Sequence, residues 1–375
     1  MNKTGGIPLN IFDALNIFYK EDTISDFLVS CFKDSPKFLI QFLKAANIHV
    51  QENMIFHIDT RVGLGKSIGT PDIVIRAKIN STMKFIIIEN KMGAAEGYEQ
   101  TNRYESTEAR TRIASRYGVE VENIEFYFIF LALDTTAKPK NSKFTFLSYQ
   151  IFLNNTWTLN NATLQLLFDG FKEKLSNFYE PIYRPYETLE SKASIDSLQR
   201  KICWQMILTE QFSSEQNLVL DWGEVGGSGR NNFLFLITKS AWKSRIPFHQ
   251  AGLAQTFYIH VDTYINLLDD GENTVEEIGV RFESFPYRPH SQIKKETGYD
   301  NFISNKNCFG EMLLEKTKKK GLIAKSRNTK LLVMTLPIKA PTIHETVQNI
   351  QKQFKAIEEC IEETIHEMQI EGLIK

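Results

Sequence analysis

Three charged residues at the ends of two predicted strands carry the clearest chemical signal in the sequence. Asp72 opens the segment Asp72–Ile79, in which β-branched and polar residues alternate as they do in a strand. Glu89 and Lys91 stand at the end of an apolar segment that begins at Lys84. Because alternate side chains of a strand share a face, Glu89 and Lys91 point the same way. If the two strands pair as a hairpin, Asp72 lies beside both residues at one end of the sheet.

This grouping of charges is suited to the chemistry of phosphate esters. Two converging carboxylates can hold a hard divalent cation through oxygen ligands, and the backbone carbonyl of Asn90 is a third candidate ligand. A lysine beside the cation can orient or deprotonate a water molecule, or offset the charge that grows on a phosphate. Taken alone, a Pro-Asp turn such as Pro71-Asp72 or a Glu–Lys pair such as Glu89 and Lys91 is common at exposed strand ends. The ordered pair at hairpin spacing favours metal-dependent hydrolysis of phosphodiester bonds.

A polar helix, expected over residues 95–117, follows this pattern along the chain. Gln100 and Tyr104 are four residues apart and therefore project from one face of that helix. Since the helix begins shortly after Lys91, this face can look back onto the charged residues. An amide and a phenol there can hydrogen-bond a phosphate, a base or the catalytic residues. Taken alone, the same spacing is also that of a polar helix face with one half-buried tyrosine.

The elements that must position these residues form an α/β arrangement. Helical periodicity runs from about Thr23 to Asn47, and a further helix is expected over residues 160–179. The strands expected in this half are Met54–Arg61, Asp72–Ile79, Lys84–Asn90, Glu125–Leu133 and Lys143–Tyr149. The order is helix, three strands, helix, strand, strand, which predicts a layered α/β domain.

The charged residues and the helix together resemble a known family. Pro71-Asp72 with Glu89-Asn90-Lys91 resembles the motif of the PD-(D/E)xK nuclease superfamily. Gln100 to Tyr104 resembles the QxxxY motif of its RecB-like branch. The run Ile86–Tyr104 is similar to bacterial PD-(D/E)xK families found near restriction and phage-defence genes.

The resemblance implies a restriction-endonuclease-like αβββαβ core and Mg²⁺-dependent cleavage of DNA, with Mn²⁺ as a possible substitute. It implies that Asp72 and Glu89 bind the metal together with the Asn90 backbone carbonyl. Lys91 would position or activate water, and Gln100 and Tyr104 would orient the site. All five side chains are therefore predicted catalytic residues, as listed here: Asp72, Glu89, Lys91, Gln100 and Tyr104.

RecB-like proteins usually supply one more acidic residue from the first helix. Glu21, just before the helical segment that starts at Thr23, is the candidate for this additional metal ligand, and Asp26 is the second choice. Both residues are equally consistent with a helix cap or a surface position.

The second half of the chain has a different pattern. Prolines at positions 181 and 185 mark the boundary, so we expect a nuclease domain over residues 1–190 and a β-rich α+β recognition or regulatory domain over 191–340. Residues 341–375 predict a long amphipathic helix. Its apolar positions follow a heptad for about three and a half repeats, which leaves two alternatives: a dimerising coiled coil in a homodimer, or a helix packed on the β-rich domain.

Composition excludes several classes of protein. With 375 residues and 42% hydrophobic residues, the chain can bury a large core and is not disordered. A net charge of -1 argues against a polybasic protein. The four cysteines are far apart, which disfavours a disulfide scaffold or a zinc site. No apolar run approaches the roughly 20 residues that cross a bilayer, so no membrane association and a cytoplasmic location are expected.

The sequence thus predicts a Mg²⁺-dependent nuclease, a hydrolase of DNA phosphodiester bonds. We expect an endonuclease of bacterial restriction or anti-phage defence. Two alternatives stay open. One is a catalytically silent DNA-binding or scaffold protein on a nuclease fold. The other is an effector that is active only with a partner protein or ligand, which would act on the C-terminal domain.

Overall fold

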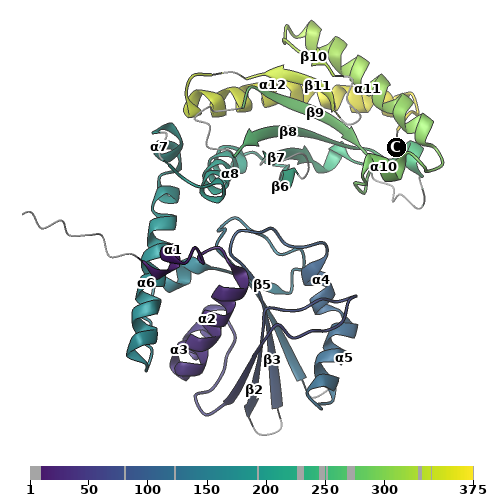
Figure 1. Cartoon of the computed structure of the whole chain (residues 1–375). Coiled ribbons are helices and arrows are strands. Elements are labelled where there is room, and N and C mark those ends of the chain that lie inside the picture. Colours follow the sequence, from purple (N-terminus) through teal and green to yellow (C-terminus); the bar gives the residue numbers. More distant parts are fainter. Residues whose placement is uncertain are drawn as a thin grey trace, which may run out of the picture. The chain divides into compact units, whose positions relative to one another are not determined.

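The computed structural model describes residues 10–79, 82–121, 124–191, 194–225, 232–244, 250, 252–267, 275–327, 332–338 and 340–374. The chain divides into two compact units, Met1–Tyr183 and Arg184–Lys375. Figure 1 shows both. The division lies seven residues before the expected boundary after residue 190. The short helix α7 (Pro185–Glu190) belongs to the second unit, and so does the C-terminal helix expected over 341–375.

The first unit is a mixed five-stranded sheet with helices on both sides (Figure 1). Its strands are β1 (Ile55–Thr60), β2 (Ile73–Ile79), β3 (Thr82–Lys91), β4 (Ile124–Ala132) and β5 (Phe144–Ser148), in the order β1-β2-β3-β4-β5. The pairs β1/β2 and β2/β3 are antiparallel, and β3/β4 and β4/β5 are parallel. Its helices are α1 (Ile11–Ala14), α2 (Glu21–Asp34), α3 (Pro36–Ala45), α4 (Gln100–Glu105), α5 (Thr107–Arg116) and α6 (Ala162–Tyr179), with 3₁₀ turns η2 (Tyr149–Phe152) and η3 (Pro181–Tyr183). The predicted α/β class is confirmed.

The central strand β3 sends its side chains to two different environments. Phe85 and Ile87 are fully buried in one core cluster with residues of α5. Glu89 and Lys91 have the same parity along the strand, so they continue this face beyond the apolar run. Asn90 points to the opposite face, toward α2. The strand therefore positions charged groups on one side of its end and a carboxamide on the other.

The polar helix expected over residues 95–117 is in fact two helices. It begins only at Gln100, and Ser106 separates α4 from α5 with an extended backbone, at φ -59° and ψ 153°. The Ser106 hydroxyl accepts the backbone N–H of Ala109 at 3.2 Å and so caps α5. The expectation of one continuous helix was wrong because a serine cap competes successfully with helix propagation at this position.

The second unit is an antiparallel six-stranded sheet with helices, an α+β arrangement. Its strands are β6 (Leu218–Val225), β7 (Asn232–Lys239), β8 (Tyr258–Asn266), β9 (Glu277–Glu283), β10 (Lys325–Ser326) and β11 (Leu332–Pro337), in the order β10-β11-β9-β8-β7-β6. Besides α7 it contains α8 (Ser197–Ser213), α10 (His290–Ile293), α11 (Tyr299–Lys319) and α12 (Ile343–Ile370), with 3₁₀ turns η4 (Ser240–Trp242) and η5 (Leu253–Gln255). No helix in the described ranges is long and apolar enough to cross a membrane.

Helix α12 buries its apolar stripe within its own unit. It contacts α7, α8 and α11. The ring centroid of Phe354 lies 5.4 Å from that of Phe212 on α8 and 6.1 Å from that of Trp242. All eight positions of the heptad pattern are at most 5% exposed: Ile343, Val347, Ile350, Phe354, Ile357, Ile361, Ile365 and Met368. Of the two alternatives for this stripe, the structure shows packing within the chain.

Candidate active site

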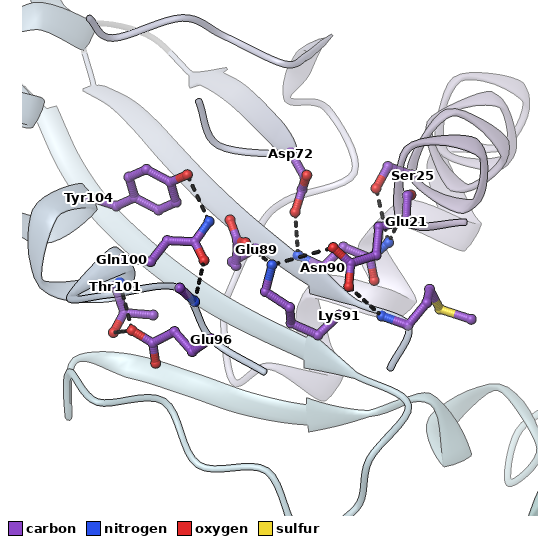
Figure 2. A network of polar contacts seen from close by, with 12 residues as sticks. Glu21, Ser25, Asp72, Glu89, Asn90, Lys91, Glu96, Gln100, Thr101 and Tyr104 are labelled. Carbon is purple, nitrogen blue, oxygen red and sulfur yellow. Dashed lines mark hydrogen bonds and ion pairs between the residues drawn. The ribbon is translucent and has the colours of Figure 1, made fainter. Parts of the chain in front are cut away.

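The pairing of β2 with β3 brings the predicted acidic residues together. Ile73 pairs with Ile88, so Asp72 and Glu89, one step further on each strand, meet at the end of the hairpin. The backbone N–H of Asn90 donates a hydrogen bond to Asp72 Oδ2 at 2.7 Å. Figure 2 shows these residues with the other predicted site residues around them. The alternation of the two strands is thus sufficient to assemble the first part of the site.

Lys91 lies between two carboxylates. Its Nζ is 2.6 Å from Glu89 Oε1 and 3.4 Å from Glu21 Oε2. The other oxygen of Glu21 accepts the backbone N–H of Met92 at 3.2 Å. Glu89 is 1% exposed and Lys91 is 8% exposed, so this ion pair is buried at the end of the strand.

The structure distinguishes the two acidic candidates of the first helix. Glu21, in the first turn of α2, reaches Lys91 and is part of the site. Asp26 instead forms an ion pair with Arg61, whose Nη2 lies 2.8 and 2.9 Å from the two carboxylate oxygens, and the Asp26 and Arg61 side chains are 50% and 41% exposed. The sequence ranks Glu21 first and Asp26 second, but both lie on the same helix within five residues, so no local pattern gives the partner of either.

Burial and mutual repulsion change the protonation of the two strand acids. Burial raises the pKa of Asp72 to about 6, against the opposing effects of the Asn90 N–H and Lys91. Burial and the Asp72 charge raise the pKa of Glu89 to about 8. Burial lowers the pKa of Lys91, but Glu89 and then Glu21 outweigh it and raise this pKa to about 12. Three carboxyl groups therefore share one ammonium group, and the cluster has a deficit of positive charge.

One oxygen of the cluster has no partner. Among the described residues, Glu89 Oε2 is a buried carboxylate oxygen without a hydrogen bond. Such an atom is costly unless something compensates it, and a hard divalent cation with oxygen ligands does so. Asp72, Glu89 and the Asn90 carbonyl therefore fit a divalent cation. No three His, Cys, Asp or Glu side chains in the described part of the chain are grouped as a complete metal site. A cation here would depend on backbone and water ligands for the rest of its shell.

Gln100 and Tyr104 face each other across one turn of α4. Gln100 Nε2 donates to the Tyr104 hydroxyl at 3.1 Å, and Gln100 Oε1 accepts the backbone N–H of Gly97 at 3.1 Å. Tyr104 is 2% exposed, and burial together with the Glu89 charge raises its pKa to about 12. Its ring lies against Gly69, at φ +110°, where a Cβ atom would sit 3.4 Å from the ring. The Tyr104 phenol therefore lies within range of electrostatic interaction with Glu89.

Two polar groups that support the site were missed from the sequence. The sequence indicates Asn90 only as a ligand through its backbone carbonyl. In the structure its side chain also forms hydrogen bonds with Ser25 of α2 and with Tyr149 of η2. Glu96 accepts the backbone N–H and hydroxyl of Thr101 at 2.9 and 2.7 Å and the backbone N–H of Lys140 at 2.8 Å. Glu96 thereby fixes the loop that leads into α4. A polar residue at a buried position of β3 is a signal for Asn90. Of the two partners of Glu96, Thr101 is five residues away, but Lys140 is 44 residues away and no local pattern indicates it.

Comparison with known proteins identifies a superfamily that the first part of the chain matches. Residues 9–167 match the family model of the PD-(D/E)XK nuclease superfamily, and this range contains every site residue described above. The predicted resemblance to this superfamily is confirmed for residues 9–167. Its members are generally nucleases and typically use divalent metal ions. The search of curated proteins and the search of solved structures each found no match.

Proposed function

We propose that the protein is a metal-dependent nuclease that hydrolyses DNA phosphodiester bonds at the end of strands β2 and β3. The observation that carries the proposal is the buried Glu89 carboxylate. One of its oxygens pairs with Lys91 and the other has no partner. Asp72, Glu89 and the Asn90 carbonyl would hold Mg²⁺, or Mn²⁺ in its place. When bound, the cation neutralises phosphate charge and lowers the pKa of its water.

Lys91 is proposed to position water or a phosphate oxygen. Since its pKa is raised to about 12, the side chain is an ammonium group at neutral pH and donates hydrogen bonds. Of the two roles considered from the sequence, positioning is therefore favoured over deprotonation. Both oxygens of Glu21 already have partners, one the Lys91 ammonium group and the other the backbone N–H of Met92. Glu21 is therefore proposed to hold Lys91 in position rather than to bind the metal.

Gln100 and Tyr104 are proposed to orient the site. With its pKa raised to about 12, the Tyr104 phenol stays protonated at neutral pH. Its hydrogen bond to Gln100 and the Gly97 contact fix both side chains on one face of α4. This arrangement supports assignment to the RecB-like branch, whose motif these two residues resemble.

The biological setting proposed for this activity is bacterial restriction or anti-phage defence in the cytoplasm, with endonucleolytic cleavage. It rests on the similarity of Ile86–Tyr104 to families encoded near such genes. The second unit has its own sheet and core and is proposed to recognise DNA, a partner protein or a ligand. A requirement for such a partner is one outcome of the following experiment.

The test is cleavage of supercoiled and linear DNA by the purified full chain with Mg²⁺, Mn²⁺ or EDTA. Asp72→Ala and Lys91→Ala should each lose at least about 100-fold in rate. Lys84→Ala is the matched control, because Lys84 lies on the same strand and pairs with Glu125 at 3.1 Å; its rate should stay within about twofold of wild type.

Full activity in a folded Lys91→Ala protein would contradict the proposal. If the folded wild-type protein does not cleave DNA, the wild type and the two site variants are compared in cells by the phenotype that the wild type confers. A phenotype lost in Lys91→Ala would indicate a partner-activated nuclease. A phenotype kept in both site variants would indicate a silent scaffold.

A further inference from the structure

The Asn90 carboxamide joins three segments on the far side of β3 from the catalytic face. Its Nδ2 donates to Ser25 Oγ at 2.9 Å and to the Glu21 carbonyl at 3.3 Å. Its Oδ1 accepts the Tyr149 hydroxyl at 2.7 Å. Asn90, Ser25 and Tyr149 are all 0% exposed, so no water competes for these bonds. Figure 2 shows Asn90 between β3 and the first turn of α2.

The orientation of this amide is determined by its partners. The Glu21 carbonyl can only accept a hydrogen bond, so the NH₂ group must face α2. The oxygen of the amide then faces Tyr149, whose hydroxyl is the donor. Meanwhile the backbone N–H of Asn90 holds Asp72 on the catalytic side. One residue thus positions Asp72 through its main chain and the first turn of α2 through its side chain.

We propose that Tyr149 is a positioning residue for the reaction proposed above. It fixes the Asn90 amide, the amide fixes the first turn of α2, and this turn holds the Glu21 carboxylate against Lys91 and the Met92 N–H. The inference rests on the proposed function for its catalytic consequence. Its structural part concerns only the chain's own hydrogen bonds and can be tested without any cleavage.

The Tyr149 ring is itself held rigidly. Its centroid lies 5.7 Å from that of Phe152 and 5.8 Å from that of Phe171. Tyr149→Phe preserves these ring contacts and removes one hydroxyl. The variant then leaves Asn90 Oδ1 buried without its donor, and the amide can recover a bond only by moving. That movement releases Ser25 and the Glu21 carbonyl, so the first turn of α2 loosens.

A matched control exists in the same unit. Tyr179 is also 0% exposed, and its hydroxyl donates to the Leu133 carbonyl at 2.7 Å. Tyr179→Phe therefore removes an equally buried phenol hydroxyl without touching Asn90. Any difference between the two variants reports on the link to α2 and not on the general loss of a buried hydrogen bond.

The first measurement is amide hydrogen exchange of the metal-free full chain. The Met92 N–H bonds Glu21 Oε1, so its protection reports the position of that carboxylate. Tyr149→Phe should speed exchange at Met92 by roughly five- to thirtyfold, and Tyr179→Phe by less than about twofold. Equal exchange rates at Met92 in both variants would overturn the proposal. If Tyr149→Phe does not fold, Ser25→Ala breaks the next link and should give the same result.

The second measurement is Mg²⁺-dependent cleavage of DNA. Tyr149→Phe should lower kcat by about three- to tenfold with KM for DNA within about twofold, because a residue that acts through Glu21 cannot cost more than the loss of that carboxylate. In a Glu21→Gln background the same change should have no further effect. A further loss there would mean that Tyr149 does not act through Glu21. If wild type does not cleave DNA on its own, the proposed function is decided by the cellular test described above, and the exchange at Met92 still decides the positioning role.

Discussion

Each unit of the molecule buries a cluster of charged side chains on its sheet. The two clusters differ in the ratio of acidic to basic side chains. In the second unit the acids Asp262 and Glu283 face the bases His260 and Arg281 on β8 and β9. His260 Nδ1 is 2.5 Å from Asp262 Oδ1, and His260 Nε2 is 3.2 Å from Glu283 Oε2. Arg281 contacts both acids as well, with Nη1 at 3.2 Å from Glu283 Oε1. Each of the two acids is therefore within ion-pair distance of both bases.

Protonation follows the balance of each cluster. Burial lowers the pKa of His260, but Asp262 and Glu283 outweigh it and raise the pKa to about 9, so the ring is cationic at neutral pH. Two cations then neutralise two carboxylates. In the first unit the three acids Asp72, Glu89 and Glu21 surround one buried ammonium group, that of Lys91, and the pKa of Glu89 is raised to about 8.

The difference separates a structural cluster from a functional one. In the second unit each of these four charged side chains lies within ion-pair distance of two side chains of opposite charge, although Arg281 Nε, like Glu89 Oε2, makes no hydrogen bond. Such a charge-balanced network fixes the packing around it. A cluster with surplus acid and an oxygen without a partner is incomplete until a cation arrives. The number of strand acids does not distinguish the two clusters, since each contains two; the number of cations that face those acids does.

The largest effect is expected from breaking the balanced cluster. Asp262→Ala leaves His260 and Arg281 with one acid between them in a buried setting. The free energy of unfolding of the second unit should fall by about 3–5 kcal/mol. The measurement is urea-dependent amide exchange in β8. Arg327→Ala removes an exposed ion pair to Glu277 and serves as control, with an expected loss below about 1 kcal/mol. Equal losses in the two variants would remove the distinction between these ion pairs.

Removing an acid from the first cluster should have the opposite sign. The pKa of Asp72 in the folded protein is about 6, above its ordinary 3.8, so the ionised form is penalised. This penalty is absent below pH 3.8 and complete above about pH 6, and wild type loses stability as pH rises through that window. Asp72→Asn keeps an oxygen for the Asn90 N–H, so the metal-free unit should gain about 1 kcal/mol at pH 8.

The check on this gain is urea unfolding of Asp72→Asn and wild type at pH 8 and near pH 4. The difference should shrink toward zero at the lower pH, because the wild-type carboxyl is then mostly protonated. Added Mg²⁺ should stabilise wild type and leave the variant unchanged. A variant that is less stable than metal-free wild type at pH 8 would show that the first cluster is balanced after all.

The smallest effect is expected at the acid that lies outside the cluster. Asp26→Asn loses only the exposed pair with Arg61, so stability should change by less than about 1 kcal/mol and cleavage by less than about twofold. Glu21→Gln, five residues earlier on the same helix, should lower cleavage by about tenfold. Both rates come from the same DNA assay. A larger loss for Asp26→Asn than for Glu21→Gln would reassign the helix acid.

Local patterns were sufficient to predict most of the first unit. Alternation and the apolar run located β2 and β3, and their hairpin pairing placed Asp72 beside Glu89. The spacing of four residues put Gln100 and Tyr104 on one helix face. These relations depend on residues close in sequence, for which strand and helix geometry is decisive.

What was missed depends on tertiary structure or on competing local signals. The three partners of the Asn90 side chain are 69, 65 and 59 residues away, and no local pattern selects them. The break at Ser106 was overlooked because helical composition continues on both sides of its cap.

The Asn90 contacts also determine when the site is finished during synthesis. A nascent chain whose residues up to Lys91 have left the ribosome still lacks Tyr149. The hydrogen bond between Tyr149 and Asn90 closes a loop of 59 residues, so it forms only after that segment has been synthesised. Strand β5, which leads into Tyr149, must also join the sheet beside β4. The growing polypeptide therefore carries its catalytic side chains well before their supporting contacts. Chains released early, before Tyr149, contain the full motif without the contact that orders it.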